Sequence, residues 1–399
     1  MELLIKSANV VDWCGSYFGD VYINDGVISE VGKNLNKNCK TIDAKGLTLM
    51  PSFVDLHVHF RDPGFTYKED IESGSKAAVR GGFTMVNLMA NTNPVCSSMD
   101  IVNYVKEKAS KVGLVDVHQV LSITRNFDGK EISHLEDIDN SIKIISEDGK
   151  DVMDGNAMLE AMKLAKHKDL IVMCHCEEHS LSKYDMRIAE NIMTLRNLEF
   201  AKITGCKIHI AHVSTIEAMK YIIRYKNEGV KVTCEVAPHH LFLNDNVNYR
   251  VNPPIRKEED VIFLMEAVKK GYVDVIATDH APHTKEDKEN GAPGISGIET
   301  AFSLCYTKLV KENGLSLNKL SEIMSKNPSE ILDVKKGTIE IGYDGDLVLV
   351  DLNKKYEIKV DEFKSKGKNT PLNGQHVYGK VVKTIKGGKE VYSSSKYNI

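Results

Sequence analysis

The chain has no long hydrophobic run and no segment typical of protein export. No stretch of its 399 residues approaches the roughly 20 apolar residues that a membrane-spanning helix needs. The first residues, MELLIKSANVV, alternate as a strand does and lack the apolar run and the cleavage site of a signal peptide. We therefore expect a globular protein that works in the cytoplasm and has no membrane partner.

The chain also lacks an excess of charge of one sign and any cluster of cysteines. Lys and Arg number 52 against 56 Asp and Glu, which gives a formal net charge of -4. No basic stripe is present that would bind a polyanion, so nucleic acid is not an expected partner. The eight cysteines are scattered, and several lie in apolar, strand-like runs, so we expect them to be reduced and mostly buried.

Both ends of the chain show short strand patterns separated by turns. Near the N-terminus, these patterns cover residues 3–11, 21–23 and 27–31. The C-terminal stretch has the same character in the segments LVLVDL, KVVKTIK and KEVY, which follow turn-forming Gly residues. We infer that residues 1–50 and 340–399 meet in one small, discontinuous β-sandwich domain.

The middle of the chain, residues 51–339, alternates short apolar strands with helical patterns, as parallel βα units do. Eight such strands predict an α/β fold of the (β/α)8 TIM-like barrel type, with a doubly wound open sheet as the structural alternative. The strand candidates are FVDLHVHF from 53, TMVNLMAN from 84, LVDVHQVL from 114, SIKIIS from 141, LIVMCHC from 170, KIHIAHVS from 207, VKVTCEV from 230 and VDVIATDH from 273.

Metal-binding residue types end several of these strands, and barrel active sites lie at the C-terminal strand ends. His57 and His59 close the first strand two residues apart, so both side chains face the barrel axis and can bind one metal ion. His175 and His212 end the fifth and sixth strands, and Asp279 ends the eighth. Imidazole and carboxylate at four strand ends predict a metal centre. Such ligands suit zinc, although manganese, cobalt or iron can occupy the same set.

Two metal ions need a bridging anion, for which the fourth strand offers two candidates. Lys143 lies within SIKIIS and bridges only after carboxylation, because an ammonium group repels cations. Asp148 lies in the Ser-Glu-Asp-Gly that follows, and Gly149 marks a turn at the strand's mouth. We favour Asp148, while without a metal site Asp148 is a turn-forming residue and Lys143 a solvated or ion-paired side chain.

These motifs resemble the amidohydrolase superfamily and, within it, the dihydroorotases of the bacterial, longer-chain kind. The likeness covers nearly the whole chain, through HVHFRDPG, NTNP, SEDG, HCEE, HVST, EVAPHHL, NPPIR, TDHAPH and SKGKNTP. NPPIR and SKGKNTP separate this branch from hydantoinase-like relatives. The chain departs from the family pattern at Ser52 and Ala90, usually Gly and Pro, at Pro293, often aromatic, and in a shorter segment between His175 and His212.

The resemblance implies roles for particular residues. Asp279 is a metal ligand and also the catalytic base, and Lys143 falls where lysine-bearing branches place their carboxylated lysine. The implied cofactor is Zn2+, one or two per subunit. The implied ligands are His57 and His59 for one metal, His175 and His212 for the second, with Asp148 as bridge and Asp279 as a further ligand. The implied substrate-binding residues are His59, Arg61, Asn91, Asn252, His283, Pro293 and Gly294.

The resemblance implies the reversible cyclisation of N-carbamoyl-L-aspartate to L-dihydroorotate in pyrimidine biosynthesis. Arg61 supports this substrate independently, because a guanidinium next to a metal site can bind a carboxylate through two hydrogen bonds, with Asn91 assisting. In the alternative, a hydantoinase- or allantoinase-like enzyme, Arg61 has no carboxylate to pair with, which is costly when buried. A catalytically dead scaffold is the third reading, which the complete ligand set disfavours. A homodimer, or association with another pyrimidine enzyme, is left open.

Overall fold

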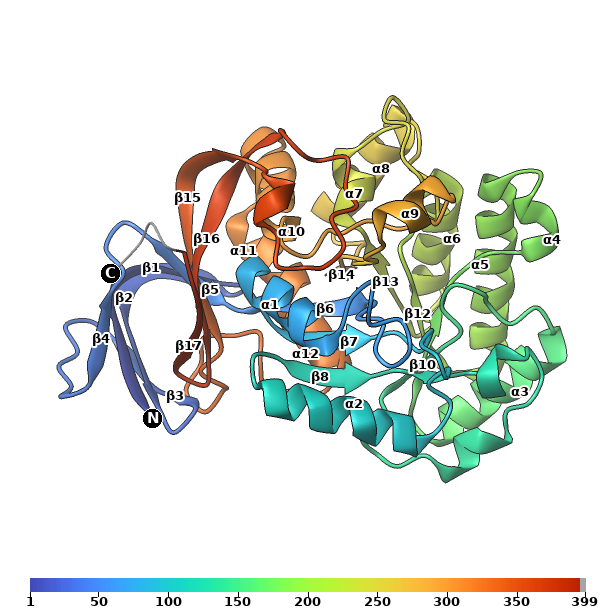
Figure 1. Cartoon of the computed structure of the whole chain (residues 1–399), viewed down its shortest axis with the longest axis horizontal. Coiled ribbons are helices and arrows are strands. Elements are labelled where there is room, and N and C mark those ends of the chain that lie inside the picture. The colour runs from blue at the N-terminus through green and yellow to red at the C-terminus, as the bar shows by residue number, and fades with distance from the viewer. Residues whose placement is uncertain (395–399) are drawn as a thin grey trace.

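The computed structural model describes residues 1–394 as a βα barrel and a mixed sheet made by both chain ends (Figure 1). In Figure 1 the blue N-terminal strands lie at the far left, and the red C-terminal strands lie between them and the barrel. Residues 395–399 of the expected C-terminal domain lie outside the described residues.

The barrel contains eight parallel strand positions, as the sequence predicts. A bridge between Val58 and His280 joins the first position to the last, so the sheet closes and the open-sheet alternative is wrong. The third strand is split at Val120, whose N–H still donates to the Leu88 carbonyl at 2.9 Å. The strands are β6 (Phe53–Val58), β7 (Phe83–Leu88), β8 (Asp116–Gln119) with β9 (Leu121–Ser122), β10 (Ile144–Ser146), β11 (Ile171–Cys174), β12 (Lys207–Ile210), β13 (Val232–Val236) and β14 (Val275–Ile276).

Amphipathic helices cover the barrel, and capping residues in the local sequence fix where they begin. The Asp154 side chain, for example, accepts hydrogen bonds from the N–H groups of Asn156 and Ala157 at the first turn of α3. The short segment after His175 forms α4 and the regular helix α5. The helices are α1 (Ile71–Gly81), α2 (Met99–Val112), α3 (Gly155–His167), α4 (His179–Ser182), α5 (Met186–Thr204), α6 (Ile216–Asn227), α7 (Pro238–Phe242), α8 (Glu258–Lys269), α9 (Lys285–Glu289), α10 (Ala301–Cys305), α11 (Leu317–Ser321) and α12 (Asn327–Ile331).

The second part is a sheet in the order β17-β16-β15-β5-β1-β2-β3, with β4 also pairing with β1. β2 begins well before the expected run 21–23, because its exposed residues 16–18 carry no apolar alternation although they pair with β1. β1 pairs in parallel with β4 and β5, and the remaining pairs are antiparallel. The strands are β1 (Glu2–Asp12), β2 (Gly15–Asn24), β3 (Val27–Gly32), β4 (Lys40–Asp43), β5 (Thr48–Pro51), β15 (Leu347–Glu357), β16 (His376–Lys386) and β17 (Lys389–Ser393).

One apolar core joins the two chain ends in this sheet. Its members come from both chain ends, which is consistent with one domain made by both ends, although the boundaries 1–50 plus 340–399 and 51–339 stay a prediction. Ser52, where the family has Gly, lies between β5 and β6, and its hydroxyl lies 2.5 Å from that of Thr84. Core members include Leu3, Ile5, Val21 and Ile23 from the N-terminal strands and Leu347, Leu349, Val382 and Ile385 from the C-terminal strands.

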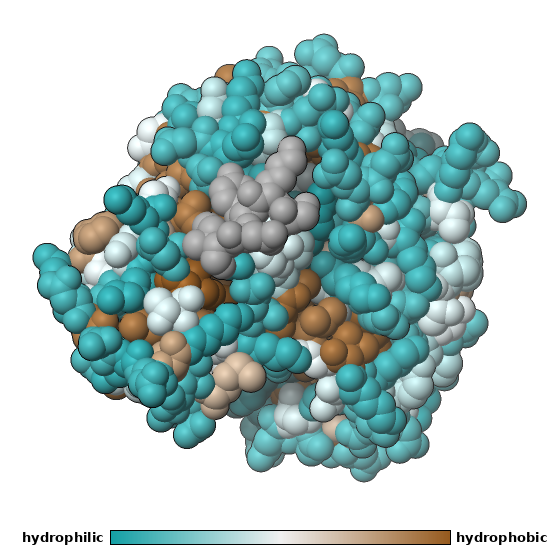
Figure 2. Space-filling model, turned by 60° about the vertical axis from the view of Figure 1, so that its left-hand side comes forward, coloured by the Kyte–Doolittle hydropathy of each residue, from teal (hydrophilic) through white to brown (hydrophobic). Residues whose placement is uncertain are grey.

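The surface and the cysteines are those of a globular protein. The face in Figure 2 is largely hydrophilic, with separate hydrophobic areas. Among residues 1–394, no helix combines the length and apolar character that crossing a bilayer requires. All eight cysteines are free, and all except Cys14 and Cys39 are buried, as expected.

A buried lysine joins the sheet to the barrel. The Nζ of Lys336 lies 2.6 Å from a carboxylate oxygen of Asp346 and 2.9 Å from those of Asp116 and Asp344. Burial lowers the pKa of Lys336, but the facing carboxylates of Asp346 and Asp116 outweigh it and raise that pKa above its ordinary value. The lysine therefore stays charged and links β8 of the barrel to the start of β15.

Replacing this lysine should destabilise the fold. In Lys336→Ala the buried carboxylate of Asp346 loses its partner, and breaking a buried ion pair costs about 3–5 kcal/mol. We expect the melting temperature, followed by circular dichroism, to fall by several degrees. Lys354→Ala, at an exposed position of β15, is the control and should melt like the wild type. Equal melting temperatures for both variants would contradict this account of the junction.

Candidate active site

The expected site residues converge on one cavity at the C-terminal ends of the barrel strands. Its volume is about 190 Å³. Of the expected ligands and substrate-binding residues, only His57 is not in the cavity wall. His57 is fully buried, and its Nε2 faces the carboxylates of Asp148 and Asp279. The lining contains all the others, together with Gly149 and Ala281: His59, Arg61, Asn91, Asp148, His175, His212, Asn252, Asp279, His283, Pro293 and Gly294.

One carboxylate oxygen lies among three imidazoles. Oδ1 of Asp148 is 3.3 Å from Nε2 of His57, 3.4 Å from Nδ1 of His175 and 3.6 Å from Nε2 of His212. Both this oxygen and Nε2 of His57 are buried without a hydrogen-bond partner. Buried polar atoms without partners are costly, so their convergence fits a cation that they would coordinate together.

A second carboxylate completes the cluster. Oδ1 of Asp279 lies 3.1 Å from Nε2 of His59 and 3.6 Å from Nε2 of His57. Two groups of ligand atoms, each within 4.8 Å of one another, result: His57 with Asp148 and His212, and His57 with His59 and Asp279. The donor set therefore fits one or two divalent metal ions, with His57 common to both groups.

Each of three histidines is oriented by a partner on its other ring nitrogen. Nδ1 of His57 donates to Oε1 of Glu235 at 2.6 Å, and Nδ1 of His59 donates to Oδ1 of Asn91 at 2.9 Å. Nε2 of His175 lies 3.1 Å from Oε2 of Glu177. Such partners fix the ring and direct the remaining nitrogen toward the metal site.

The cluster favours positive charge. Burial raises the pKa of both carboxyl groups, but the facing imidazoles, His57 foremost for Asp148 and His59 for Asp279, hold both pKa values below the ordinary range. Burial lowers the pKa of His175, but Asp148 and Glu177 outweigh it and raise that pKa to about 10. The two carboxylates are therefore ionised and stabilise cations here, whether these are protons or metal ions.

Sequence reasoning missed two buried acids that hold the expected ligands His57 and Asp279. Asp55 accepts hydrogen bonds from the N–H of His57 at 3.2 Å and from the N–H and hydroxyl of Thr278 at 2.9 and 2.6 Å, so it ties β6 to the end of β14. Asp55, His57 and His59 alternate along one strand face, which is a pattern that could have revealed it. Glu235, a lone acid in the apolar strand VTCEV, offered a similar signal.

Three residues at the strand mouths have left-handed backbones although none is glycine. The φ angles are 60° at Arg61, 32° at His212 and 46° at Asp279. Such conformations cost of order 1–3 kcal/mol each and persist only where surrounding contacts hold them. Among residues 1–394, eight further non-glycine residues share this backbone region, so these three angles support the candidate site only together with its side-chain geometry.

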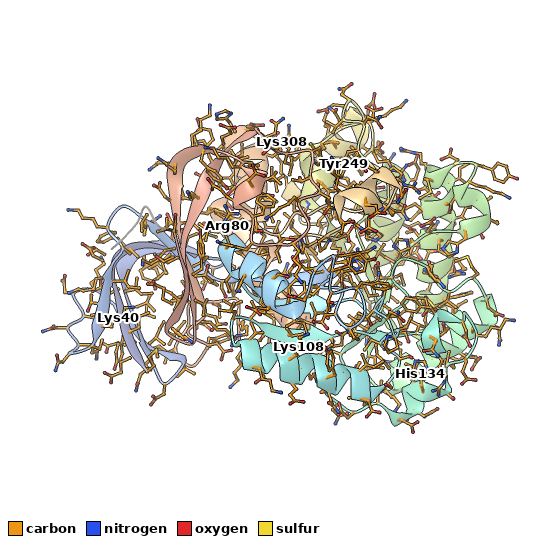
Figure 3. All side chains as sticks on the ribbon, viewed as in Figure 1. Lys40, Arg80, Lys108, His134, Tyr249 and Lys308 are labelled. Atoms are coloured by element: carbon orange, nitrogen blue, oxygen red, sulfur yellow. The ribbon has the colours of Figure 1, made fainter. Side chains whose placement is uncertain are left out.

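The cavity wall also carries a guanidinium, an imidazole and an amide, from Arg61, His283 and Asn91. Nη2 of Arg61 donates to Nε2 of His283 at 3.2 Å, and Nε of Arg61 is buried without a partner. Burial, then the charge of Arg61, lowers the pKa of His283 to about 3, so its imidazole is neutral and can accept. The next residue, Asp62, fixes the loop by accepting from Lys108 of α2 at 2.6 Å (Lys108 is labelled in Figure 3). Asn91 uses its oxygen on His59, which leaves its N–H groups for a ligand.

The two bridge candidates lie at different ends of the barrel. Lys143 comes just before β10, and its Nζ lies 3.1 Å from Oδ2 of Asp333. It lines a separate cavity with Lys207, where β12 begins. Asp148, after β10, contacts four of the expected ligands, His57, His59, His175 and His212. Lys143 therefore does not reach the cluster, because the residue order along the strand places it at the entry rather than at the mouth.

Two substitutions separate these candidates. We expect Lys143→Ala to keep the bound metal and the activity, since its side chain ends at Asp333 on the far side of the barrel. Asp148→Ala should lose metal, because four histidines then lack the carboxylate that they share. Metal content per chain, measured by mass spectrometry on the purified variants, checks both. Loss of metal from Lys143→Ala alone would contradict the assignment.

Comparisons with known proteins agree with this geometry. The model of the Amidohydrolase family matches residues 48–391. A dihydroorotase of Clostridium botulinum is 54% identical over 98% of this chain and 100% of its own length, and one of Ruminiclostridium cellulolyticum is 41% identical over 98% of each. The solved L-hydantoinase (dihydropyrimidinase) from Arthrobacter aurescens superposes with a TM-score of 0.90 at 26% identity, covering 100% of this chain and 97% of that one. With the family model spanning most of its length, this chain belongs to the amidohydrolase family.

Proposed function

We propose that this chain is a metal-dependent dihydroorotase, which converts N-carbamoyl-L-aspartate and L-dihydroorotate into one another in pyrimidine biosynthesis. The observation that carries the proposal is the half-buried guanidinium of Arg61, whose Nε is buried and unpartnered, beside a cluster of candidate metal-ligating side chains. A substrate with both a carboxylate and a cyclic amide satisfies both features. The relatives named as dihydroorotases, at 54% and 41% identity over nearly full length, support it.

We assign the metal ligands within this proposal to the cluster already described. His57, His59, His175, His212 and Asp279 supply ligand atoms. Asp148, which belongs to the first group and also faces His59 of the second, is the proposed bridge. The ion proposed is Zn2+, one or two per chain, because imidazole with carboxylate suits it. When bound, the metal supplies a nucleophilic water at neutral pH and polarises the ring carbonyl.

The protein's own residues handle the proton and the substrate. Asp279, the carboxylate nearest His59, takes the proton of the attacking water and passes it to the departing ring nitrogen; the cyclisation reverses these steps. Arg61 binds the substrate carboxylate, and the free N–H groups of Asn91 assist. The remaining proposed contacts to the ring come from Asn252, His283 and the backbone of Pro293 and Gly294.

The rival readings explain fewer of these observations. A hydantoinase-like substrate lacks the carboxylate, so the half-buried Arg61 guanidinium would have no anionic group of the substrate to pair with. A dead scaffold does not need a complete ligand set with oriented imidazoles. Action in the cytoplasm, and a homodimer or a partner from the same pathway, stay predictions of the proposal.

Removal of metal should abolish activity without unfolding the protein. We expect His57→Ala to lose bound metal and dihydroorotate turnover, because His57 belongs to both ligand groups. The variant should still fold, as judged by its circular dichroism spectrum, although it should melt at a lower temperature because the buried Glu235 loses its bond to Nδ1 of His57. Chelator-treated wild type should likewise lose turnover and regain activity with Zn2+. A metal-free His57→Ala protein with full activity would contradict the mechanism.

Substrate selection by Arg61 is the direct test of the function. Arg61→Met should lower kcat/KM for dihydroorotate by two or more orders of magnitude, from the roughly 3 kcal/mol lost when a buried charge loses its partner. Carboxylate-free dihydrouracil should be much less affected, and the metal content unchanged. Arg224→Met, on the exposed face of α6, is the matched control. An equal decline for both substrates would remove the main physical support for dihydroorotate.

A further inference from the structure

A segment of the small domain crosses to the barrel mouth. Residues 363–371, here called the strap, lie between the turn η5 (Val360–Glu362) and β16 and contain SKGKNTP. Burial alternates along it as in a strand with one covered face. Phe363, Ser365, Gly367 and Asn369 are buried, whereas Lys364, Lys366 and Lys368 are exposed.

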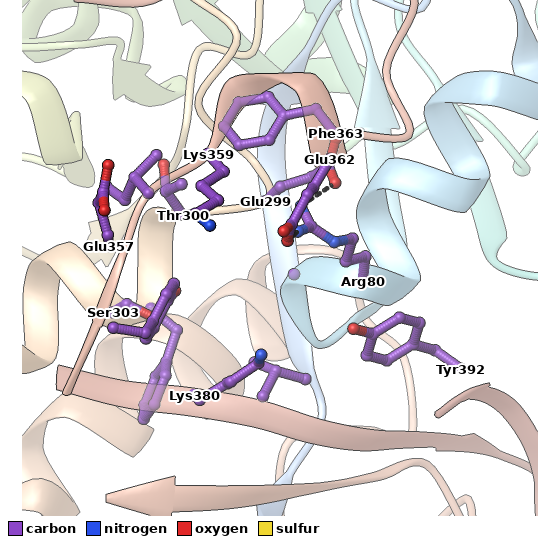
Figure 4. A pocket seen from close by; sticks show the side chains of 15 residues that line it. Arg80, Glu299, Thr300, Ser303, Glu357, Lys359, Glu362, Phe363, Lys380 and Tyr392 are labelled. Carbon is purple, nitrogen blue, oxygen red and sulfur yellow. Dashed lines mark hydrogen bonds and ion pairs between the residues drawn. The ribbon is translucent and has the colours of Figure 1, made fainter. Parts of the chain in front are cut away.

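Two carboxylates of the barrel hold the backbone of the strap. Glu299 accepts hydrogen bonds from the N–H of Lys364 at 2.8 Å and of Ser365 at 3.0 Å. Arg80 pairs with Glu299 at 2.5 Å, and Figure 4 shows the two side chains directed toward each other near Phe363. The fully buried Glu69 accepts from the Ser365 hydroxyl and from the N–H of Lys366. The strap therefore has a fixed position.

Asn369 uses its whole side chain to join two loops of the cavity. Its Nδ2 donates to the carbonyls of Ala281 and Gly294, both at 3.1 Å. Its Oδ1 accepts from the N–H of His283 and the hydroxyl of Ser296, both at 2.8 Å. Ala281, His283 and Gly294 line the cavity, whereas Asn369 does not. Asn369 thus contacts the substrate wall from behind.

The loops that Asn369 joins are tightly packed, so they have little room to move and form other contacts in its place. A Cβ at Gly294, where φ is 133°, would lie 2.8 Å from the Cβ of Ala281. On its outer side, Lys288 donates from Nζ to the carbonyls of Ala292 at 2.8 Å and Gly294 at 3.0 Å. Within the strap, a Cβ at Gly367 would lie 2.6 Å from that of Pro282. The wall is therefore a tight backbone contact fixed from two sides.

We propose that Asn369 is a positioning residue, through which the small domain fixes the substrate-binding wall formed by Ala281, His283 and Gly294. A primary amide presents two donors and one oxygen with two acceptor sites, which match the two carbonyls and the two donors that it meets. His283 in turn contacts Arg61, so the wall also positions the guanidinium. The part of this inference that concerns substrate rests on the proposed dihydroorotase function.

The test compares Asn369→Asp with a matched asparagine in the same connection. Aspartate keeps the oxygen toward His283 and Ser296 but places an oxygen against two carbonyls. We expect KM for dihydroorotate to rise about tenfold or more, since each 1.4 kcal/mol of lost binding is tenfold, while kcat and metal content stay near wild type. Asn373→Asp is the control, because Asn373 is exposed and accepts only from the N–H of Val360 among the bonds of the described residues.

Hydrogen–deuterium exchange gives a readout that does not depend on the reaction. Without substrate, the peptide spanning 281–296 should exchange faster in Asn369→Asp than in Asn373→Asp. Should Asn369→Asp fail to fold, Ser296→Ala, which removes one bond to the same amide, must show the faster exchange instead. Unchanged exchange in the folded variant, or loss of kcat and metal with unchanged KM, overturns the proposal. A wild type inactive on dihydroorotate refutes the proposed function but leaves the exchange result valid.

Discussion

Two buried carboxylates at the mouth of the barrel need positive charge close to them, and the surrounding structure has to hold that charge in place. Asp148 and Asp279 are ionised away from water, and isolated charges there would be costly. The imidazoles that face them supply positive charge or hold metal ions. Each imidazole needs a fixed orientation, and Glu235, Asn91 and Glu177 provide it. The chemistry therefore depends on contacts that begin outside the cavity.

The barrel meets this requirement by bringing together strand ends that are far apart in sequence. Asp55 on β6 fixes Thr278, which precedes Asp279, so the first and last strands share one buried carboxylate. Left-handed backbones at three site residues show that the mouth is held against local preference. The contacts of the closed sheet thus hold both the strained residues and the buried acids, and the stability of the sheet offsets the free-energy cost of these residues.

Sequence patterns predicted what is local and periodic. Alternation in FVDLHVHF placed His57 and His59 together, and the Asp-Gly turn placed Asp148 at the strand mouth. The break at Val120 and the early start of β2 were not predicted from the sequence, because both depend on pairing with neighbouring strands rather than on apolar alternation. The contacts of Asn369 escaped for the same reason, since its partners come from distant loops and a motif alone does not identify them.

The pairing of β5 with β15 has a consequence for how the chain is made. Leu49 lies opposite Leu349, so the edge of the N-terminal strands finds its neighbour only after nearly the whole barrel sequence has been synthesised. An unpaired strand edge is prone to pair with other chains, and contacts between distant segments form slowly. During translation the emerging N-terminal strands therefore need shielding, by chaperones or by rapid burial of their apolar face, until the last strands leave the ribosome.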